Sequence, residues 1–206
     1  MISLFIDTSL DYVRAALVKD NELLAFKEGN MPNMHSVYAT SYIRQVLDDA
    51  GIDANNIDKI MVVNGPGSFT GVRIGVTIAK TYGHLIKKEV TPLSSLKCLA
   101  LSKKHEGNIM CLISARRNNY YMGLYNQDNN EIVPEAFIDG NQVLALVEKY
   151  QPVVVSNEFS VLGSVKIEKT NLNILEIIKY YQDKETVNAH KLVPNYLKLP
   201  QVLEND

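Results

Sequence analysis

The chain has little of what marks several classes of protein. It has no tryptophan, only two cysteines among 206 residues, and a net charge of −2 at pH 7. Two cysteines are too few for a disulfide scaffold, and a slightly acidic balance gives no overall attraction to nucleic acid. No apolar run approaches the roughly 20 residues that cross a bilayer. Since 46% of the residues are apolar and 21% are charged, the composition is that of a folded globular protein.

The two cysteines, Cys98 and Cys111, have neither a CxxC spacing nor a short-spaced histidine between them, because His105 is too far from both. A disulfide remains an alternative. Both residues lie in largely apolar segments, however, which favours buried free thiols and a reducing compartment. The chain begins MISLFIDTS, without a basic and apolar leader. We therefore expect a cytoplasmic protein without a membrane segment.

The order of the predicted elements indicates an α/β duplication. Three short strands with tight turns are followed by a helix, a strand and a second helix, and the same order begins again near residue 108. Equivalent strand ends, Ile6 and Ile113, are 107 residues apart. We therefore expect two subdomains, 1–104 and 105–206, with their boundary in the polar segment 103–107.

The predicted elements follow from the apolar pattern and the turn residues. The expected strands are 2–7, 12–18, 23–27, 60–63, 90–93, 108–113, 119–125, 131–137 and 153–156. The expected helices are 35–49, 70–87, 94–103, 141–149 and 172–181.

The most unusual segment is 64–75, with the sequence NGPGSFTGVRIG. A strand enters it and a helix leaves it, an arrangement in which backbone N–H groups can hold an anion. It is neither a Walker A loop nor a GxGxxG motif. Two interpretations stay open: a tight turn in which Ser68 or Thr70 caps the helix, and a loop that binds phosphate or a partner. The candidate phosphate-binding residues are Asp7, Thr8, Ser9, Gly65, Gly67 and Ser68.

The helix after this segment has a small residue at every fourth position, namely Gly71, Gly75, Ala79 and Gly83. Each glycine inside a helix costs roughly 1 kcal/mol relative to alanine. We therefore expect another backbone to approach this stripe closely. That backbone belongs either to the chain's own sheet or to a second subunit, and the pattern does not decide between them.

Residues that could support hydrolysis are scattered. The four histidines, His35, His84, His105 and His190, form no HExxH or HxxxH pair, and no serine stands in a GxSxG context. Asp7, at the end of the first strand, is the best single acidic candidate, and turn formation is its alternative role. We therefore assign no catalytic residue and no metal ligand.

Five motifs together resemble one known family. They are IDTS at 6–9, HS at 35–36, NGPGSFTGVRIG at 64–75, SARRNNYYMG at 114–123 and PNYL at 194–197. Over nearly its whole length the chain is similar to the bacterial TsaB family, also called YeaZ. The resemblance implies the actin-like, sugar-kinase-like (ASKHA) ATPase fold with two duplicated subdomains. It also implies a part in placing threonylcarbamoyl on the adenosine next to the tRNA anticodon.

The same resemblance implies partners. A member of this family is a non-catalytic accessory subunit that binds the larger catalytic paralogue TsaD and, through that pair, the ATPase TsaE. Alone it forms homodimers through the helices that otherwise meet TsaD, and it meets tRNA only through the complex. In this sequence those helices correspond to 35–49 and 71–86. The implied interface residues are His35, Tyr38, Tyr42, Val46, Gly71, Ile74, Gly75, Ile78, Ala79, Tyr82 and Gly83.

Two departures from nucleotide-binding members of the fold argue against ATP hydrolysis by this chain. The turn 8–11 (TSLD) contains no glycine, so its side chains would crowd a triphosphate. Ser114 stands where the family usually has aspartate, which leaves Mg²⁺ few carboxylate ligands. We expect no cofactor on the chain alone, and we leave ATP or ADP with Mg²⁺ to an interface within the complex.

Two other functions are weighed against the partner subunit. An autonomous actin-like-fold ATPase or kinase would need the phosphate-binding groups discussed above. A glycoprotease-like peptidase would need a metal pair or an activated nucleophile, and the histidine pair of the catalytic paralogue is absent. Arg116 and Arg117, near Tyr120, Tyr121 and Tyr125, suggest an RNA contact. The net charge of −2 favours an ordinary hairpin with a basic tip instead.

Overall fold

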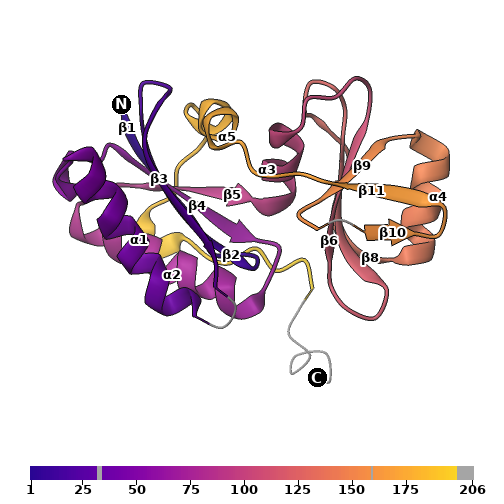
Figure 1. The fold of residues 1–206 in the computed structure, drawn as a ribbon, viewed down its shortest axis with the longest axis horizontal. Helices are drawn as coiled ribbons and strands as arrows, with labels where there is room; N and C mark the ends of the chain where they lie inside the picture. The colour runs from indigo at the N-terminus through magenta and orange to yellow at the C-terminus, as the bar shows by residue number, and fades with distance from the viewer. Residues whose placement is uncertain (32–33, 159, 199–206) are drawn as a thin grey trace. The chain divides into compact units, whose positions relative to one another are not determined.

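The computed structural model describes residues 1–31, 34–158 and 160–198, which form two compact units (Figure 1). Unit 1 contains residues 1–95 and 174–194, and unit 2 contains residues 96–173 with the described residues from 195 onward. The division therefore differs from a single cut near residue 105. The segment 96–104 groups with unit 2, and 174–194 returns to unit 1 because a helix and a 3₁₀ turn of this segment pack there.

Unit 1 is built on a five-stranded sheet. Its strands β1 (Ile2–Asp7), β2 (Tyr12–Lys19) and β3 (Glu22–Asn30) form an antiparallel meander. Strands β4 (Lys59–Gly65) and β5 (Val90–Ser94) continue the sheet parallel to β1, in the order β3-β2-β1-β4-β5. Strands β1 and β4 lie inside this sheet and are almost entirely buried, as expected of strands covered on both faces.

Helices cover both faces of this sheet (Figure 1). Helices α1 (His35–Ala50) and α2 (Phe69–Leu85) share one apolar core with the strands. Helix α5 (Ile174–Tyr181) packs against β1 and β2 from the other side, and the 3₁₀ turn η2 (Ala189–Lys191) packs against α2. A second 3₁₀ turn, η1 (Ala54–Asn56), leads into β4.

Unit 2 repeats this plan with a six-stranded sheet. Strands β6 (Ile109–Ser114), β7 (Asn119–Tyr125) and β8 (Glu131–Asp139) form its meander. Strand β9 (Val153–Ser156) is parallel to β6, and β11 (Val165–Lys169) is parallel to β9 and paired with β10 (Ser160–Leu162) at the edge. Helix α4 (Gly140–Tyr150) packs on β7 and β8, and α3 (Ser95–Ser102) leads from β5 into this unit.

The order β8-β7-β6-β9-β11 in unit 2 matches β3-β2-β1-β4-β5 in unit 1. The predicted duplication and the actin-like, sugar-kinase-like fold are therefore confirmed. One detail of the prediction is wrong: the helix expected at 172–181 does not complete the second repeat, because α5 belongs to unit 1. In unit 2 the strand β10 connects β9 to β11, where unit 1 has the helix α2. Among the described residues, no helix is both long and apolar enough to cross a membrane.

Candidate functional site

The glycine-rich segment 64–75 closes directly onto the first hairpin of unit 1. The backbone N–H of Ser68 donates to the carbonyl oxygen of Ser9 at 2.7 Å. A Cβ atom on Gly67 would lie 2.2 Å from that carbonyl oxygen, and a Cβ atom on Gly71 would lie 2.1 Å from the carbonyl oxygen of Thr8. Only glycine allows these approaches, so the two glycines are explained by contacts with the chain's own backbone.

Ser68 caps the first turn of α2 by accepting hydrogen bonds from its backbone N–H groups. The hydroxyl oxygen of Ser68 accepts from the N–H of Gly71 at 3.3 Å, and the carbonyl oxygen of Ser68 accepts from Val72 at 2.8 Å. The hydroxyl of Ser95 donates to the carbonyl of Pro66, where the loop turns. The tight-turn interpretation of the segment is therefore confirmed, with Ser68 rather than Thr70 as the N-cap.

The small-residue stripe of α2 also faces the interior of unit 1. The hydroxyl of Thr8 donates to the carbonyl of Gly71 at 2.7 Å, and a Cβ atom on Gly75 would lie 2.6 Å from that hydroxyl oxygen. Ala79 is fully buried in the core, and Gly83 is in contact with Ala189. The approaching backbone expected from the stripe is thus the chain's own.

The residues of the expected interface differ in burial. Five of its residues are buried within unit 1, namely Val46, Gly71, Gly75, Ala79 and Gly83. The other six are half-buried, namely His35, Tyr38, Tyr42, Ile74, Ile78 and Tyr82. Of these, Tyr42, Ile78 and Tyr82 pack against the core of unit 1.

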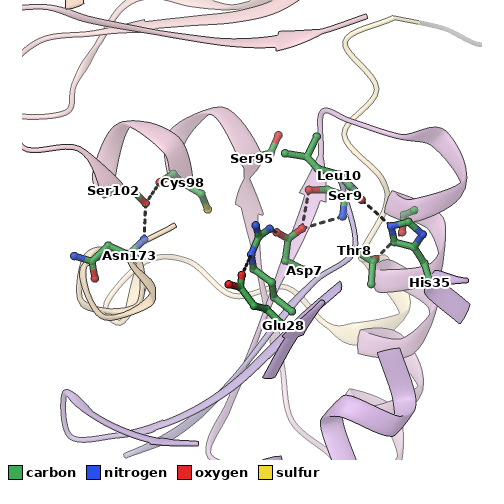
Figure 2. Close-up of polar contacts among 12 residues, drawn as sticks. Asp7, Thr8, Ser9, Leu10, Glu28, His35, Ser95, Cys98, Ser102 and Asn173 are labelled. Carbon is green, nitrogen blue, oxygen red and sulfur yellow. Dashed lines mark hydrogen bonds and ion pairs between the residues drawn. The ribbon is translucent and has the colours of Figure 1, made fainter. Parts of the chain in front are cut away.

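Asp7 is held by the hairpin that it begins (Figure 2). One carboxylate oxygen accepts from the N–H of Ser9 at 2.9 Å and from its hydroxyl at 2.7 Å, and the other accepts from the Arg14 guanidinium at 3.0 Å. Arg14 also donates to Glu28 at 3.1 Å. The alternative role of Asp7 in turn formation is confirmed. Arg14 was missed from the sequence, although it is the one charged residue inside the apolar run 12–18.

These residues do not fit the phosphate and Mg²⁺ that nucleotide-binding members of the fold hold at the first hairpin. The Asp7 carboxylate is already paired with Arg14, and the backbone at Thr8 and Ser9 is in contact with the glycine-rich loop. The corresponding hairpin of unit 2 follows Ser114, which is exposed and brings no carboxylate. At its tip Arg116 and Arg117 are exposed, with φ values of 67° and 51°.

Tyr125 is not available for a contact with RNA. It is fully buried, its hydroxyl donates to Glu135 at 2.7 Å, and the ammonium of Lys97 lies 3.8 Å from the centre of its ring. Burial and the neighbouring carboxylate of Glu135 raise the pKa of Tyr125 far above its ordinary value. Tyr120 and Tyr121 remain half-buried on the same strand.

The cysteines behave as the sequence predicts, since Cys98 and Cys111 are free and buried. Burial raises the pKa of the Cys111 thiol well above its ordinary value, so that it is not a reactive thiolate. In the part of the chain that the structure describes, no three His, Cys, Asp or Glu side chains come together as a metal site.

The exposed residues in the first half of α1 and on α2 up to position 81 carry few charges. We call these residues the α1–α2 surface: Ser36, Val37, Thr40, Ser41, Phe69, Thr70, Arg73, Thr77 and Thr81. Val37 is 59% exposed and Phe69 is 40% exposed. Arg73, the one charged member of this set, lies over the ring of Phe69 at 3.8 Å. Depletion of charge together with exposed aromatic, aliphatic and arginine side chains is typical of an interface core.

His35 links this surface to the first hairpin. Its Nε2 lies 2.7 Å from the carbonyl oxygen of Leu10, which is a hydrogen bond donated by the imidazole (Figure 2). The first turn of α1 is thereby attached to the tip of the hairpin that holds Asp7. The expected interface residue His35 thus has a structural task of its own.

Comparison with known proteins adds sequence relatives. Residues 21–193 match the family model described as TsaD, tRNA N6-adenosine threonylcarbamoyltransferase. The tRNA threonylcarbamoyladenosine biosynthesis protein TsaB of Bacillus subtilis (strain 168) is 33% identical, over 98% of this chain and 96% of its own length. The protein of the same name from Haemophilus influenzae is 26% identical, over 95% of this chain and 92% of its own length.

Two solved structures from Pseudomonas aeruginosa share the fold. One is named YeaZ and superimposes with a TM-score of 0.77 at 22% identity, covering 95% of this chain and 99% of that chain. The other is described as an uncharacterized protein with similarity to peptidase YEAZ. It superimposes with a TM-score of 0.81 at 23% identity, covering 96% of this chain and 99% of that chain.

Proposed function

Since the chain belongs to the TsaB (YeaZ) family of tRNA threonylcarbamoyladenosine biosynthesis proteins, we propose that it is a non-catalytic partner subunit in the cytoplasm. Its α1–α2 surface binds the larger, TsaD-like catalytic paralogue, and this pair recruits a TsaE-like ATPase. The tRNA is reached through that complex. The observation that carries the proposal is the low charge of the α1–α2 surface.

This surface has the composition of a buried contact. In the first half of α1 the exposed residues are uncharged, and among the exposed residues of α2 up to position 81 only Arg73 carries a charge. Lys80 on the same helix is half-buried, and its ammonium donates to the carbonyl of Leu192. The stacked pair Phe69 and Arg73 supplies an aromatic and an arginine side chain, which are enriched at interfaces, and Val37 adds exposed apolar area. A partner that covers them removes apolar area from water, and Arg73 is the one charge among them that the partner has to match.

A second copy of the chain is the occupant when the paralogue is absent. A two-fold dimer uses the same patch on both subunits, so a patch whose one charge is Arg73 meets little like-charge repulsion in its copy. Homodimer and heterodimer then exclude each other. Mixing the chain with its paralogue is expected to convert the one into the other.

The absence of catalysis is proposed on the geometry of the first hairpin. Asp7 is paired with Arg14, and the glycine-rich loop contacts the backbone of Thr8 and Ser9. ATP or ADP with Mg²⁺ is therefore left to an interface formed within the complex. No observation on the described residues favours an autonomous ATPase or kinase, or a peptidase.

The proposal is tested by mixing the purified chain with the TsaD-like paralogue and measuring the mass after gel filtration by light scattering. We expect a one-to-one complex that is lost in Val37→Glu and Thr77→Arg. Both positions are exposed, so these variants should fold, whereas a bulky residue at buried Gly75 would disturb unit 1 itself.

A matched control is Val161→Glu, because Val161 is 63% exposed in unit 2 and Val37 is 59% exposed. This variant should bind as the unchanged chain does. Failure of the two proteins to co-elute, with or without nucleotide and the TsaE-like protein, would contradict the proposed function.

A further inference from the structure

A pair of facing histidines lies at the end of α2, outside the α1–α2 surface and unused by the proposed function. His84 is in the last turn of α2 and His190 is in η2. The Nδ1 atom of His84 lies 3.1 Å from the Nε2 atom of His190, and the ring planes meet at 66°. Both side chains are exposed. We propose that His84 and His190 together chelate a divalent late transition-metal ion, with Zn²⁺ as the representative ligand.

The separation of the two nitrogen atoms fits a chelate. A zinc–imidazole bond is about 2.0–2.1 Å long, so two such ligands at angles of about 95–110° place their nitrogen atoms about 3.0–3.4 Å apart. The observed 3.1 Å lies within this interval. An N–H···N hydrogen bond between the two rings fits the same distance. The experiment below distinguishes this hydrogen bond from a metal chelate.

The backbone around the pair is fixed, so little ordering is needed for binding. A Cβ atom on Gly83 would lie 2.9 Å from the Cβ of Ala189, which shows how closely α2 and η2 approach. The side chain of Asn188 accepts from the N–H of His190 at 3.0 Å. Val90 and Val187 exchange two backbone hydrogen bonds of 2.9 and 2.8 Å beside them. A preorganised pair binds more tightly than two mobile side chains do.

The surroundings admit a hydrated cation. The pair lines a pocket of about 490 Å³, which leaves room for water molecules as the remaining ligands. His84 lies at the carbonyl end of α2, where the helix dipole favours positive charge. The pocket also contains Glu89, which favours a cation, and Lys87 and Lys88, which oppose one. Imidazole nitrogen selects zinc, copper or nickel over magnesium or calcium, whose preferred ligands are oxygens.

Two protein ligands make a weaker site than the four ligands of a structural zinc centre, so we expect the ion to bind reversibly. Its effect is to tie η2 to α2 at a second point. Isothermal titration of the metal-free full chain with ZnCl₂ should show about one ion per chain, and Zn²⁺ should raise the melting temperature. His84→Asn and His190→Asn should each lower the affinity at least tenfold and abolish the rise in melting temperature.

His105→Asn is the control, because His105 lies elsewhere in the chain and should leave the binding of Zn²⁺ unchanged. Electron paramagnetic resonance of added Cu²⁺ is an independent measurement, in which the unchanged chain should show two imidazole nitrogen ligands. Zinc affinity that is equal in the chain and in both variants, or a copper signal without two nitrogen ligands, would overturn the proposal. The pair would then be a hydrogen bond only.

Discussion

Arg14 on β2 lies directly opposite Asp7 on β1, and its guanidinium donates to the buried Asp7 carboxylate at 3.0 Å. The same guanidinium reaches Glu28 on β3, so one side chain connects three neighbouring strands. The acidic residue at the end of the first strand thus has its counterion on the next strand.

Removing that counterion is expected to destabilise the fold strongly. Arg14→Met leaves the carboxylate of Asp7, which is 1% exposed, without its ion pair. Loss of one partner of a buried ion pair costs about 3–5 kcal/mol, and urea unfolding measures the change. Arg44→Met is the control, because Arg44 pairs with Asp48 on the surface of α1 and its side chain is 84% exposed. Equal effects of the two substitutions would contradict the structural role of Arg14.

A substitution at Gly71 should have the opposite sign from that expected of an ordinary helix. Glycine to alanine inside a helix normally stabilises it by up to about 1 kcal/mol. In this chain the added Cβ would lie 2.1 Å from the carbonyl oxygen of Thr8, so Gly71→Ala should destabilise the protein by about 1–3 kcal/mol. Thr77→Ala, on the exposed face of α2, should be neutral or stabilising. Thermal unfolding of the two variants measures the difference. A stabilised Gly71→Ala protein would contradict the close contact between Gly71 and the carbonyl of Thr8.

Lys59 is expected to hold the end of α5 in place. Its ammonium donates to the carbonyls of Tyr181 at 3.1 Å and Gln182 at 2.6 Å, and burial lowers the pKa of Lys59. Lys59→Met should therefore destabilise the protein by about 1–3 kcal/mol, since these carbonyls lose a charged donor. Lys179→Met, at an exposed position of α5, should change the free energy of unfolding much less. Hydrogen exchange should also show faster opening of α5 in the first variant alone.

In unit 2, the stability contributed by the ion pair of Lys103 and Glu168 should depend on pH. The ammonium of Lys103, bonded to the carboxylate at 3.0 Å, holds the pKa of Glu168 below its ordinary value. Because the folded pKa is the lower one, this contribution to stability is present above about pH 4.3, the ordinary value, and is lost as the pH falls. Lys103→Met should raise the pKa of Glu168, as measured by carboxyl NMR titration. Lys166→Met should raise it less, because Lys166 is the smallest of the causes.

The strands of the meanders were predictable because each is a short apolar run bounded by turn residues. The run 2–7 and the run 119–125 were predicted with the bounds that β1 and β7 have. The hairpin of β10 and β11 was missed because β10 has only three residues, too few for a period to show.

The candidate site was less predictable, for a physical reason that α2 illustrates. The small residues of α2 repeat at every fourth position, but the sequence did not show whether they face the chain's own sheet or a second subunit. The carbonyl of Thr8, brought to Gly71 by a contact across 63 residues, decides this. Arg14 was likewise not predicted as the partner of Asp7, because the sequence does not give the register of β1 and β2 that places the two residues opposite each other.

The return of residues 174–194 to unit 1 has a consequence for synthesis on the ribosome. When β5 has just emerged, Lys59 has not yet met the carbonyls of 181 and 182, Lys80 has not met that of Leu192, and Val90 has not met Val187. Most of unit 2, residues 96–173, is made in the interval. The first unit to begin folding is therefore among the last to finish, and a nascent chain halted at residue 95 lacks the segment that covers its own β5 edge.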